Sequence, residues 1–560
     1  MQPTLARSLL KLEMSLGDPR MQVDSLPRLP AIALSTPHAQ GLFKLDSGWR
    51  LAAVAPDLTG WGHPPAVANI NKSCFLPYFW LSLIRDTVLA QGSSTYREAP
   101  SKLLCPPPAV AAKMTSFSMT DNSSSPSNSW PLDQFVQDPG YLAYQEELRC
   151  LIFNTAQTAA PSRETSPAPG EYGPPDEEFV AQAQTKAALS SGRRLEYLKN
   201  YVAQVAPWLD MFDSNRAFTV QVPVLARRCP ALLYAILALS ARQMERKEAK
   251  QHSFDSLELY QEAIRLLNPL LQVRDLTIIP ICVILCCLEM MSASPQDWRK
   301  HLEGCAALFD AFGVNGFSGG LLQAVFWCYA RMDLCGALIS DGTQGTLVPL
   351  DKWLPPGANP DSAADIFRDN RSPDMHANYS VYLCSKVCEL VADRTHYVEL
   401  GENNGCDSAS FERRWLRLWN DLQNWLQERP PEVIPVQSIE SRPFPQILFV
   451  HWAGISSNQL YHTACTLLLG SKPREVKLDV GPTGSAIWHA KCICGISLTN
   501  PHQGCLNNAI QPLWIAGRLL SHKSEHLLLS KLIQSIEAMT GWATCWRIAD
   551  LETSWGYKVR

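Results

Sequence analysis

Five side chains near the C-terminal end of the chain are of the types that bind zinc. Histidine nitrogen and cysteine thiolate are preferred zinc ligands, and they occur close together at His489, Cys492, Cys494, His502 and Cys505. Structural zinc sites usually separate a pair of ligands by at least two residues, whereas one residue separates Cys492 from Cys494. Apolar residues are woven through the segment, which favours core cysteines in a helix followed by a turn. We therefore predict no metal site here.

A second candidate site lies in the apolar segment 321–339. Trp327 is followed there by Arg331 and Asp333, two charged residues in a run of helical spacing. A buried charge must be paired or solvated, so an ion pair or an exposed helix face is one interpretation. The alternative is a small-molecule pocket between helices, with Trp327, Arg331 and Asp333 in its lining. The sequence leaves both interpretations open.

Sequence patterns of the common catalytic sites are absent. Neither of the glycine-rich patterns that cradle phosphates occurs, and the chain has no G-x-S-x-G and no H-E-x-x-H. An enzyme that uses Arg331, Asp333 or the segment from His489 to Cys505 remains an alternative. The missing motifs count against it, so we predict no enzyme, no catalytic residues and no cofactor.

Composition excludes several classes of protein. The chain has 560 residues, and 49 Lys and Arg against 53 Asp and Glu give a net charge of −4, so no global basic field indicates nucleic acid binding. Many of the 18 cysteines lie in apolar runs such as 281–288, which predicts buried thiols in a reducing compartment. The longest apolar stretch, 276–288, is shorter than the ~20 residues of a membrane span. We predict a soluble protein with no membrane segment.

Helical spacing dominates the chain from about residue 192. Apolar stripes run through 255–267, where Pro269 is expected to end the helix, through 295–312 and through 411–425. Other segments with helical character are 194–206, 230–247, 321–339, 376–400, 447–469, 486–499 and 524–539. Strand-like alternation is scarce and no repeat of fixed period occurs, so the predicted fold is all-α, an irregular multi-helix bundle or array.

Three regions differ in composition along the chain. Residues 1–130 hold short apolar patches among Pro, Ser and Gly, and we expect mostly irregular, largely disordered structure there. Residues 131–190 are expected to form a short helical segment and a Pro- and Ser-rich linker. Residues 191–560 are predicted to form the all-α domain.

Several blocks of the sequence carry a resemblance to a known family. These blocks are Pro230–Gln243 (PALLYAILALSARQ), Trp298–Ala306 (WRKHLEGCA), Phe326–Asp333 (FWCYARMD), Gln459–Leu469 (QLYHTACTLLL), His489–Ile496 (HAKCICGI) and Thr540–Trp542 (TGW). They are similar to the fungal-specific transcription factor domain, the regulatory region of fungal zinc-cluster activators. The resemblance extends over roughly residues 131–560 and implies an all-α regulatory domain in the nucleus.

The resemblance implies a transcriptional regulator that senses a ligand or binds partners. Its expected partners are other transcription regulators or coactivators, a homodimer or heterodimer remains open, and no catalytic residue is carried over. The family usually adds a six-cysteine zinc cluster, but only Cys74 and Cys105 precede residue 131 and no Cys-x-x-Cys occurs. We therefore expect the protein to reach DNA only indirectly, through partners. The alternative is that residues 1–113 have replaced a true N-terminal segment that carries the zinc cluster. A helical interaction scaffold without sensing is the remaining alternative.

Overall fold

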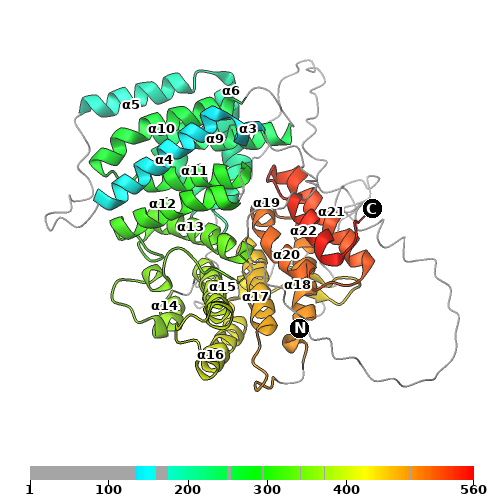
Figure 1. Ribbon diagram of the computed structural model, residues 1–560. Helices are drawn as coiled ribbons and strands as arrows, with labels where there is room; N and C mark the ends of the chain where they lie inside the picture. Colours follow the sequence, from blue (N-terminus) through cyan, green and yellow to red (C-terminus); the bar gives the residue numbers. More distant parts are fainter. Residues whose placement is uncertain are drawn as a thin grey trace, which may run out of the picture. The chain divides into compact units, whose positions relative to one another are not determined.

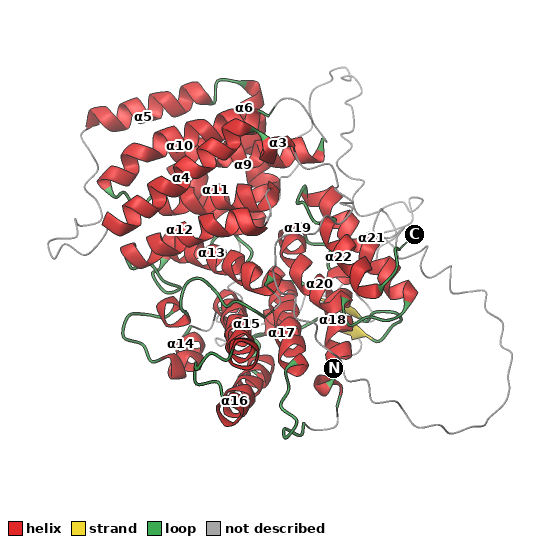
Figure 2. Cartoon of the chain, viewed as in Figure 1, coloured by secondary structure: helices red, strands yellow, loops and turns green. Residues whose placement is uncertain are grey.

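A computed structural model describes residues 134–158, 175–248, 254–292, 295–340, 342–370, 372–478 and 481–559 (Figure 1). The predictions made for residues 1–130 lie outside these ranges. Most of the described residues are helical and very few are in strands, as Figure 2 shows, which confirms the predicted all-α class. The domain boundary predicted at residue 191 stays a prediction. The helices that precede residue 191 pack against α9, α10 and α12.

The first group of helices covers residues 134–339. Its α-helices are α3 (Gln134–Gln137), α4 (Pro139–Thr158), α5 (Pro175–Ala188), α6 (Gly192–Asn200), α7 (Ala206–Leu209), α8 (Val222–Leu225), α9 (Pro230–Lys247), α10 (Asp255–Val273), α11 (Ile278–Ser292), α12 (Pro295–Phe312) and α13 (Gly320–Ile339). π-Helical turns at Tyr201–Val205 and Ala217–Gln221 flank α7. In Figure 1, α4, α9, α10, α11, α12 and α13 form a stack in which neighbouring helices are in contact.

The second group covers residues 350–555. Its α-helices are α14 (Ala363–Asp369), α15 (Pro373–Thr395), α16 (Ser408–Gln427), α17 (Trp452–Gly470), α18 (Ala486–Thr499), α19 (Gln503–Leu506), α20 (Ile510–Gly517), α21 (Lys523–Thr540) and α22 (Trp546–Trp555). Shorter turns are a π-turn at His396–Leu400 and 3-10 turns at Leu350–Trp353, Pro360–Ser362, Pro431–Val433, Pro482–Gly484 and Asn507–Ala509. The two groups meet where α13 contacts α15 and α20, and where α9 contacts α21.

Helix α11 forms the centre of the first group because its sequence is apolar on nearly every side, with Glu289 and Ser292 as buried polar exceptions. All of its residues except Met290 are buried, and it contacts α9, α10, α12 and α13. A helix that is apolar all round has no face for solvent and is stable only in the interior. Pro280 falls in the first turn, where the missing backbone N–H has no partner to lose. The apolar run 276–288 is therefore a core helix.

Two of the expected boundaries were wrong. Helix α10 does not end before Pro269 but continues through it to Val273. Pro269 lies on the exposed face, where the carbonyl that it leaves without a donor can be hydrated. The helix predicted for 447–469 begins only at Trp452, and Ile447 belongs to a strand.

That strand is part of a short antiparallel hairpin. β1 (Gln437–Ile439) pairs with β2 (Gln446–Leu448), with Ser438 opposite Ile447. The side chain of Asn500 binds β2 on its other side, because its Nδ2 donates to the carbonyl of Ile447 at 2.7 Å and its Oδ1 accepts from Phe449 N at 2.9 Å. An asparagine at the end of α18 thus holds extended backbone that apolar spacing alone assigned to a helix.

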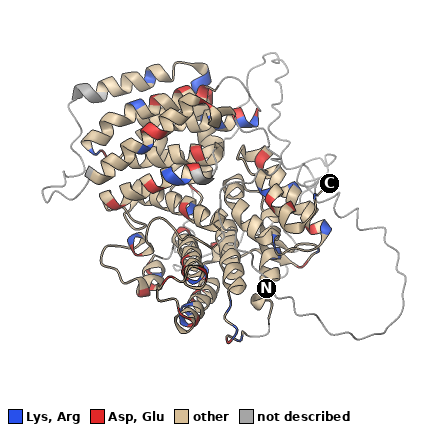
Figure 3. Cartoon of the chain, viewed as in Figure 1, with Lys and Arg blue, Asp and Glu red and all other residues tan. Residues whose placement is uncertain are grey.

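Charge and hydropathy of the described helices agree with the composition. Figure 3 shows basic and acidic residues interspersed along the helices. Within the described ranges, no helix combines the length and the apolar character needed to cross a bilayer. The cysteines in these ranges are free thiols and most of them are buried.

Candidate functional site

A cavity lies where the two groups of helices meet. The volume available to the centres of water molecules is about 80 Å³, several times the ~10–15 Å³ that one water molecule needs. The whole empty space, including the part that is open to solvent, is about 780 Å³. The lining residues are Trp208, Leu209, Met211, Cys287, Met290, Cys328, Arg331, Met332, Leu334, Cys335, Leu338, Ser456, Gln459, Leu460, Asn507, Asn508, Gln511, Pro512 and Trp542. They come from α7, α11, α13, α17, the turn before α20, α20 and the loop after α21. Such a mixture of apolar walls and a few polar groups is typical of ligand pockets.

Arg331 is the only charged side chain in this lining. Its side chain is 93% buried, since 7% of the residue's surface is exposed, and Nη2 donates to the carbonyl of Leu209 at 2.6 Å. The guanidinium carbon lies 5.5 Å from the centroid of the Phe212 ring. Burial lowers the pKa of Arg331, although the carboxylates of Asp210 and Asp213 act in the opposite direction. The guanidinium is thus a cation in an apolar wall.

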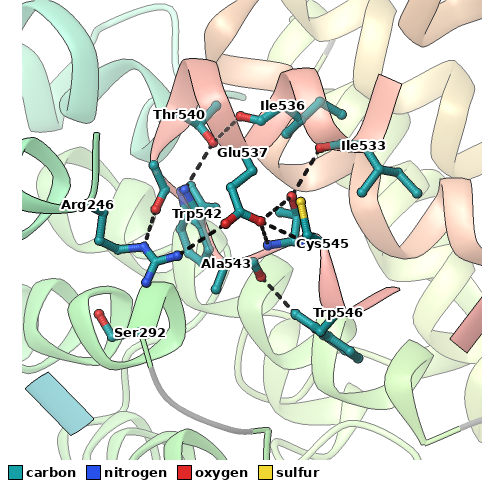
Figure 4. A network of polar contacts seen from close by, with 12 residues as sticks. Arg246, Ser292, Ile533, Ile536, Glu537, Thr540, Trp542, Ala543, Cys545 and Trp546 are labelled. Atoms are coloured by element: carbon teal, nitrogen blue, oxygen red, sulfur yellow. Dashed lines mark hydrogen bonds and ion pairs between the residues drawn. The ribbon is translucent and has the colours of Figure 1, made fainter. Parts of the chain in front are cut away.

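Trp542 enters the cavity on a loop that is anchored from two sides (Figure 4). Glu537 Oε2 accepts hydrogen bonds from the backbone N–H groups of Thr544 at 2.8 Å and Cys545 at 2.7 Å. Its other oxygen lies 3.6 Å from Nη2 of Arg246 in α9, and Arg246 Nε donates to the carbonyl of Gly541. The loop therefore links the first group of helices to α21 and α22.

Gly541 makes the start of this loop possible. It ends α21 with a φ of +81°, a conformation that residues with a Cβ rarely adopt. A second small hollow continues from the cavity past Trp542, because the linings of both include Met290, Cys335, Asn507, Gln511 and Trp542. The loop thus forms the wall between two connected spaces.

The structure brings only one of the three predicted pocket residues to the cavity. Trp327 donates from its indole N–H to the carbonyl of Gly316 at 2.8 Å and packs against Trp353, so it anchors the loop after α12. Asp333 is fully buried and accepts hydrogen bonds from the backbone N–H groups of Leu347 at 2.9 Å and Val348 at 3.1 Å. Arg331 and Asp333 form no ion pair with each other in the described structure.

The environment of Asp333 explains its role further. Burial raises the pKa of Asp333 to about 6, and the backbone hydrogen bonds from Leu347 and Val348 oppose this rise. A carboxylate that accepts hydrogen bonds from backbone N–H groups positions the segment around Leu347 and Val348, and Tyr329 OH is a third donor at 3.3 Å. Arg331 and Asp333, which are close in sequence, thus have different roles. Arg331 lines the cavity, and Asp333 holds a loop in place.

The predicted cysteine and histidine cluster is split in space. His489, Cys492 and Cys494 lie buried in α18, whereas Cys505 lies in α19 and its Sγ is 3.5 Å from Nδ1 of His502. Within the ranges described, no group of three His, Cys, Asp or Glu side chains has a geometry that could hold a metal ion.

His489 instead forms a buried pair with a histidine of α17. Its Nδ1 lies 2.8 Å from Nδ1 of His462, and its Nε2 lies 2.9 Å from the carbonyl of Thr483. Because a carbonyl only accepts, Nε2 of His489 carries the proton, and His462 Nδ1 then donates to His489 Nδ1. Burial lowers the pKa of His489 to about 4, so the pair is neutral.

Several lining residues gave no signal in the sequence analysis. Trp208, Asn507 and Gln511 are single residues of three different elements, and no spacing rule connects them. Trp542 was noticed only as part of the block Thr540–Trp542. A polar residue in an apolar helix, such as Gln459 in α17, is the signal that comes nearest to marking the site.

The described residues thus form an all-α fold around a largely apolar cavity, whose lining comes from many elements. The chain belongs to the family described as the fungal specific transcription factor domain, which matches residues 196–555. This domain is a part of transcriptional regulators.

A curated relative is similar to the chain over part of its length. It is the transcription activator AMTR1 of Alternaria alternata, which is 24% identical over 349 residues. The match covers 49% of this chain and 43% of that protein, so the chain spans less than half of its relative. No solved structure matches the chain significantly.

Proposed function

We propose that the protein is a transcriptional regulator in the nucleus whose all-α domain senses a small molecule in the cavity around Arg331. The observation that carries the proposal is the position of this cavity, at the contact between the two helix groups within the family domain. A ligand there would touch α11 and α13 of the first group and α17 and α20 of the second. Differential contact of this kind shifts the balance between two arrangements of packed helices.

The lining argues against an enzyme. General acid-base catalysis needs a His, Glu, Asp, Lys, Tyr or free thiolate near the reacting group, and the lining offers only cysteines from that set. Burial raises the pKa of Cys328 to about 11 and that of Cys335 to about 11. These cysteines are protonated at neutral pH and are poor nucleophiles. The cavity is suited to binding without chemistry.

Partner proteins complete the proposal. With a net charge of −4 and interspersed charges, the chain offers little non-specific attraction to phosphates. We propose that it acts on transcription through other regulators or coactivators and reaches DNA through them, as a homodimer or a heterodimer. The relative's name, which describes an activator, makes activation the expected direction.

A tethering experiment tests the proposal. The full chain is fused to an unrelated DNA-binding domain, and a reporter gene is measured in a fungal host. We expect transcription to differ several-fold from that given by the DNA-binding domain alone, and Cys335→Leu, which narrows the cavity, to change this output. The matched control is Cys150→Leu on the exposed face of α4. If the fusion gives the same transcription as the DNA-binding domain alone, the proposal is contradicted.

A helical interaction scaffold without sensing is the second candidate. The hairpin region presents aliphatic side chains to solvent, with Val436 62% exposed, Ile439 50% and Val450 81%. Neighbouring exposed apolar side chains mark protein interaction surfaces. In this case Val436→Ser with Val450→Ser would abolish the tethered output, and Cys335→Leu would leave it unchanged.

A further inference from the structure

The described structure contains four buried arginines, and three of them face a carboxylate. Arg149 lies 3.9 Å from Glu289, Arg242 lies 3.6 Å from Glu245, and Arg547 lies 2.9 Å from Asp550. Because an unpaired buried charge is costly, such pairing is expected for arginines that serve only the fold. The fourth buried arginine, Arg331, departs from this rule.

Arg331 forms no ion pair with any residue in the described ranges. A guanidinium has five N–H donors, and the protein supplies Arg331 with one acceptor, the carbonyl of Leu209. Its other nitrogens are not among the buried polar atoms that lack a partner, so they are not sealed in protein. Since Arg331 lines the cavity, these donors open into it.

The remaining lining is complementary to an anion with an apolar body. It contains no Asp or Glu that would pair with the guanidinium in place of a ligand. It also contains no Lys that would compete with the guanidinium for an anion. The indole N–H groups of Trp208 and Trp542 are buried and have no acceptor in the described structure, so the two rings contribute apolar surface to this wall. Met211, Met290 and the buried cysteines supply soft apolar surface that adapts to irregular ligands.

We propose that the cavity binds a small organic acid, whose carboxylate pairs with Arg331 and whose apolar body lies against the methionines and tryptophans. This inference deepens the proposed sensing function and rests on it for its biological meaning. A carboxylate matches the planar fork of a guanidinium through two parallel hydrogen bonds. Contact with Trp542 would place the acid against the loop that Glu537 and Arg246 anchor.

The test uses the purified full chain and two pairs of probes, hexanoate with hexanamide and benzoate with benzamide. Each amide has the shape of its acid without the charge. Binding is measured by titration calorimetry and by the shift in thermal midpoint at constant ionic strength. We expect at least one acid to bind about 10- to 100-fold more tightly than its amide, the range of a charge-assisted hydrogen bond.

Three variants in the cavity and one control outside it separate the carboxylate contact from the fold. Arg331→Gln should remove the preference for the acid and leave binding of the amide, and Arg331→Lys should restore part of the preference. Cys335→Leu should weaken acid and amide alike, because it narrows the apolar part. Arg242→Gln, a buried arginine outside the lining, controls for general destabilisation.

Several results would overturn the inference. Equal binding of acid and amide would do so, as would a preference that survives in Arg331→Gln or a lack of binding by every acid. If chloride or sulfate at the same ionic strength gives the same shift, the site holds an adventitious ion only. A chain that regulates the tethered reporter but binds no acid contradicts this inference alone, whereas acid binding without an effect on transcription contradicts the sensing function.

Discussion

The carboxylate of Glu289 is a fully buried charge at the centre of the first helix group, and replacing it should be strongly destabilising. It accepts hydrogen bonds from Gln145 Nε2 at 2.7 Å and Tyr260 OH at 2.9 Å, and His301 Nδ1 lies 2.8 Å away. Arg149 Nη2 is 3.9 Å from the same carboxylate. Helices α4, α10, α11 and α12 thus meet at one acceptor. We predict that Glu289→Gln removes the charge and replaces one acceptor oxygen by an NH₂ donor, so that at least one of the two sets of donors loses its acceptor.

The size of the effect follows from what remains in the core. The variant leaves Arg149 with the exposed Glu146, whose carboxylate is 3.8 Å away, and leaves His301 without its carboxylate partner. Breaking a buried ion pair in this way costs about 3–5 kcal/mol, which is roughly a 10²- to 10⁴-fold change in the folding equilibrium. That cost is a large part of the ~5–15 kcal/mol by which most domains are stable.

The dependence on pH provides a more specific signature. Burial alone would lower the pKa of His301, but the neighbouring Glu289 and Cys305 raise it to about 10. A histidine with a raised pKa contributes stability below its unfolded pKa of about 6.5, and this contribution is lost as the pH rises toward 10. The difference corresponds to at most about 5 kcal/mol. In Glu289→Gln, the effect of burial on the pKa of His301 is no longer opposed by the Glu289 carboxylate. The loss of stability between about pH 6.5 and pH 10 should therefore be smaller than in the wild type.

Urea unfolding followed by circular dichroism at pH 6 to 10 measures both effects. Glu245→Gln is the matched control, because Glu245 is similarly buried and binds the backbone N–H of Ser256 at 2.9 Å, but its partners in the described structure are Ser256 and Arg242 and include no histidine. The control should lose stability without a change in the alkaline slope. If Glu289→Gln unfolds at the wild-type urea concentration, or keeps the wild-type slope, the proposed network is wrong.

Three further predictions concern other parts of the described structure. Because burial lowers the pKa of His489 to about 4, stability should fall by about 3 kcal/mol as the pH drops from 6.5 to 4, and His489→Gln should flatten that fall in acid urea titrations. Glu537→Gln should cost about 1–3 kcal/mol and speed amide hydrogen exchange at the two backbone N–H groups that its carboxylate binds. Gly495→Ala should lower the thermal midpoint, since its Cβ would overlap the carbonyl of Pro445, whereas Gly470→Ala, with open space around it, should not.

The helices could be predicted because their apolar spacing is a local property. Phe411, Trp415, Leu418, Leu422 and Trp425 form one stripe in the sequence, and all of them are buried in α16. Where the spacing failed, a residue distant in sequence decided the structure. Ile447 has a helical pattern around it, but the side chain at position 500 holds its backbone in a strand, and no window of the sequence contains both.

The cavity could be predicted only in part for the same reason. Arg331 was noticed because a charge in an apolar helix needs an explanation, and among the described residues that charge forms no direct ion pair. Asp333 gave the same signal two residues away, yet its partners are backbone groups of a loop 14 residues further along the chain. Sequence shows that each charge must be compensated, but only the fold shows by what. A buried charge that its own protein compensates serves the structure, and one that opens into a cavity without a counter-charge is suited to a ligand.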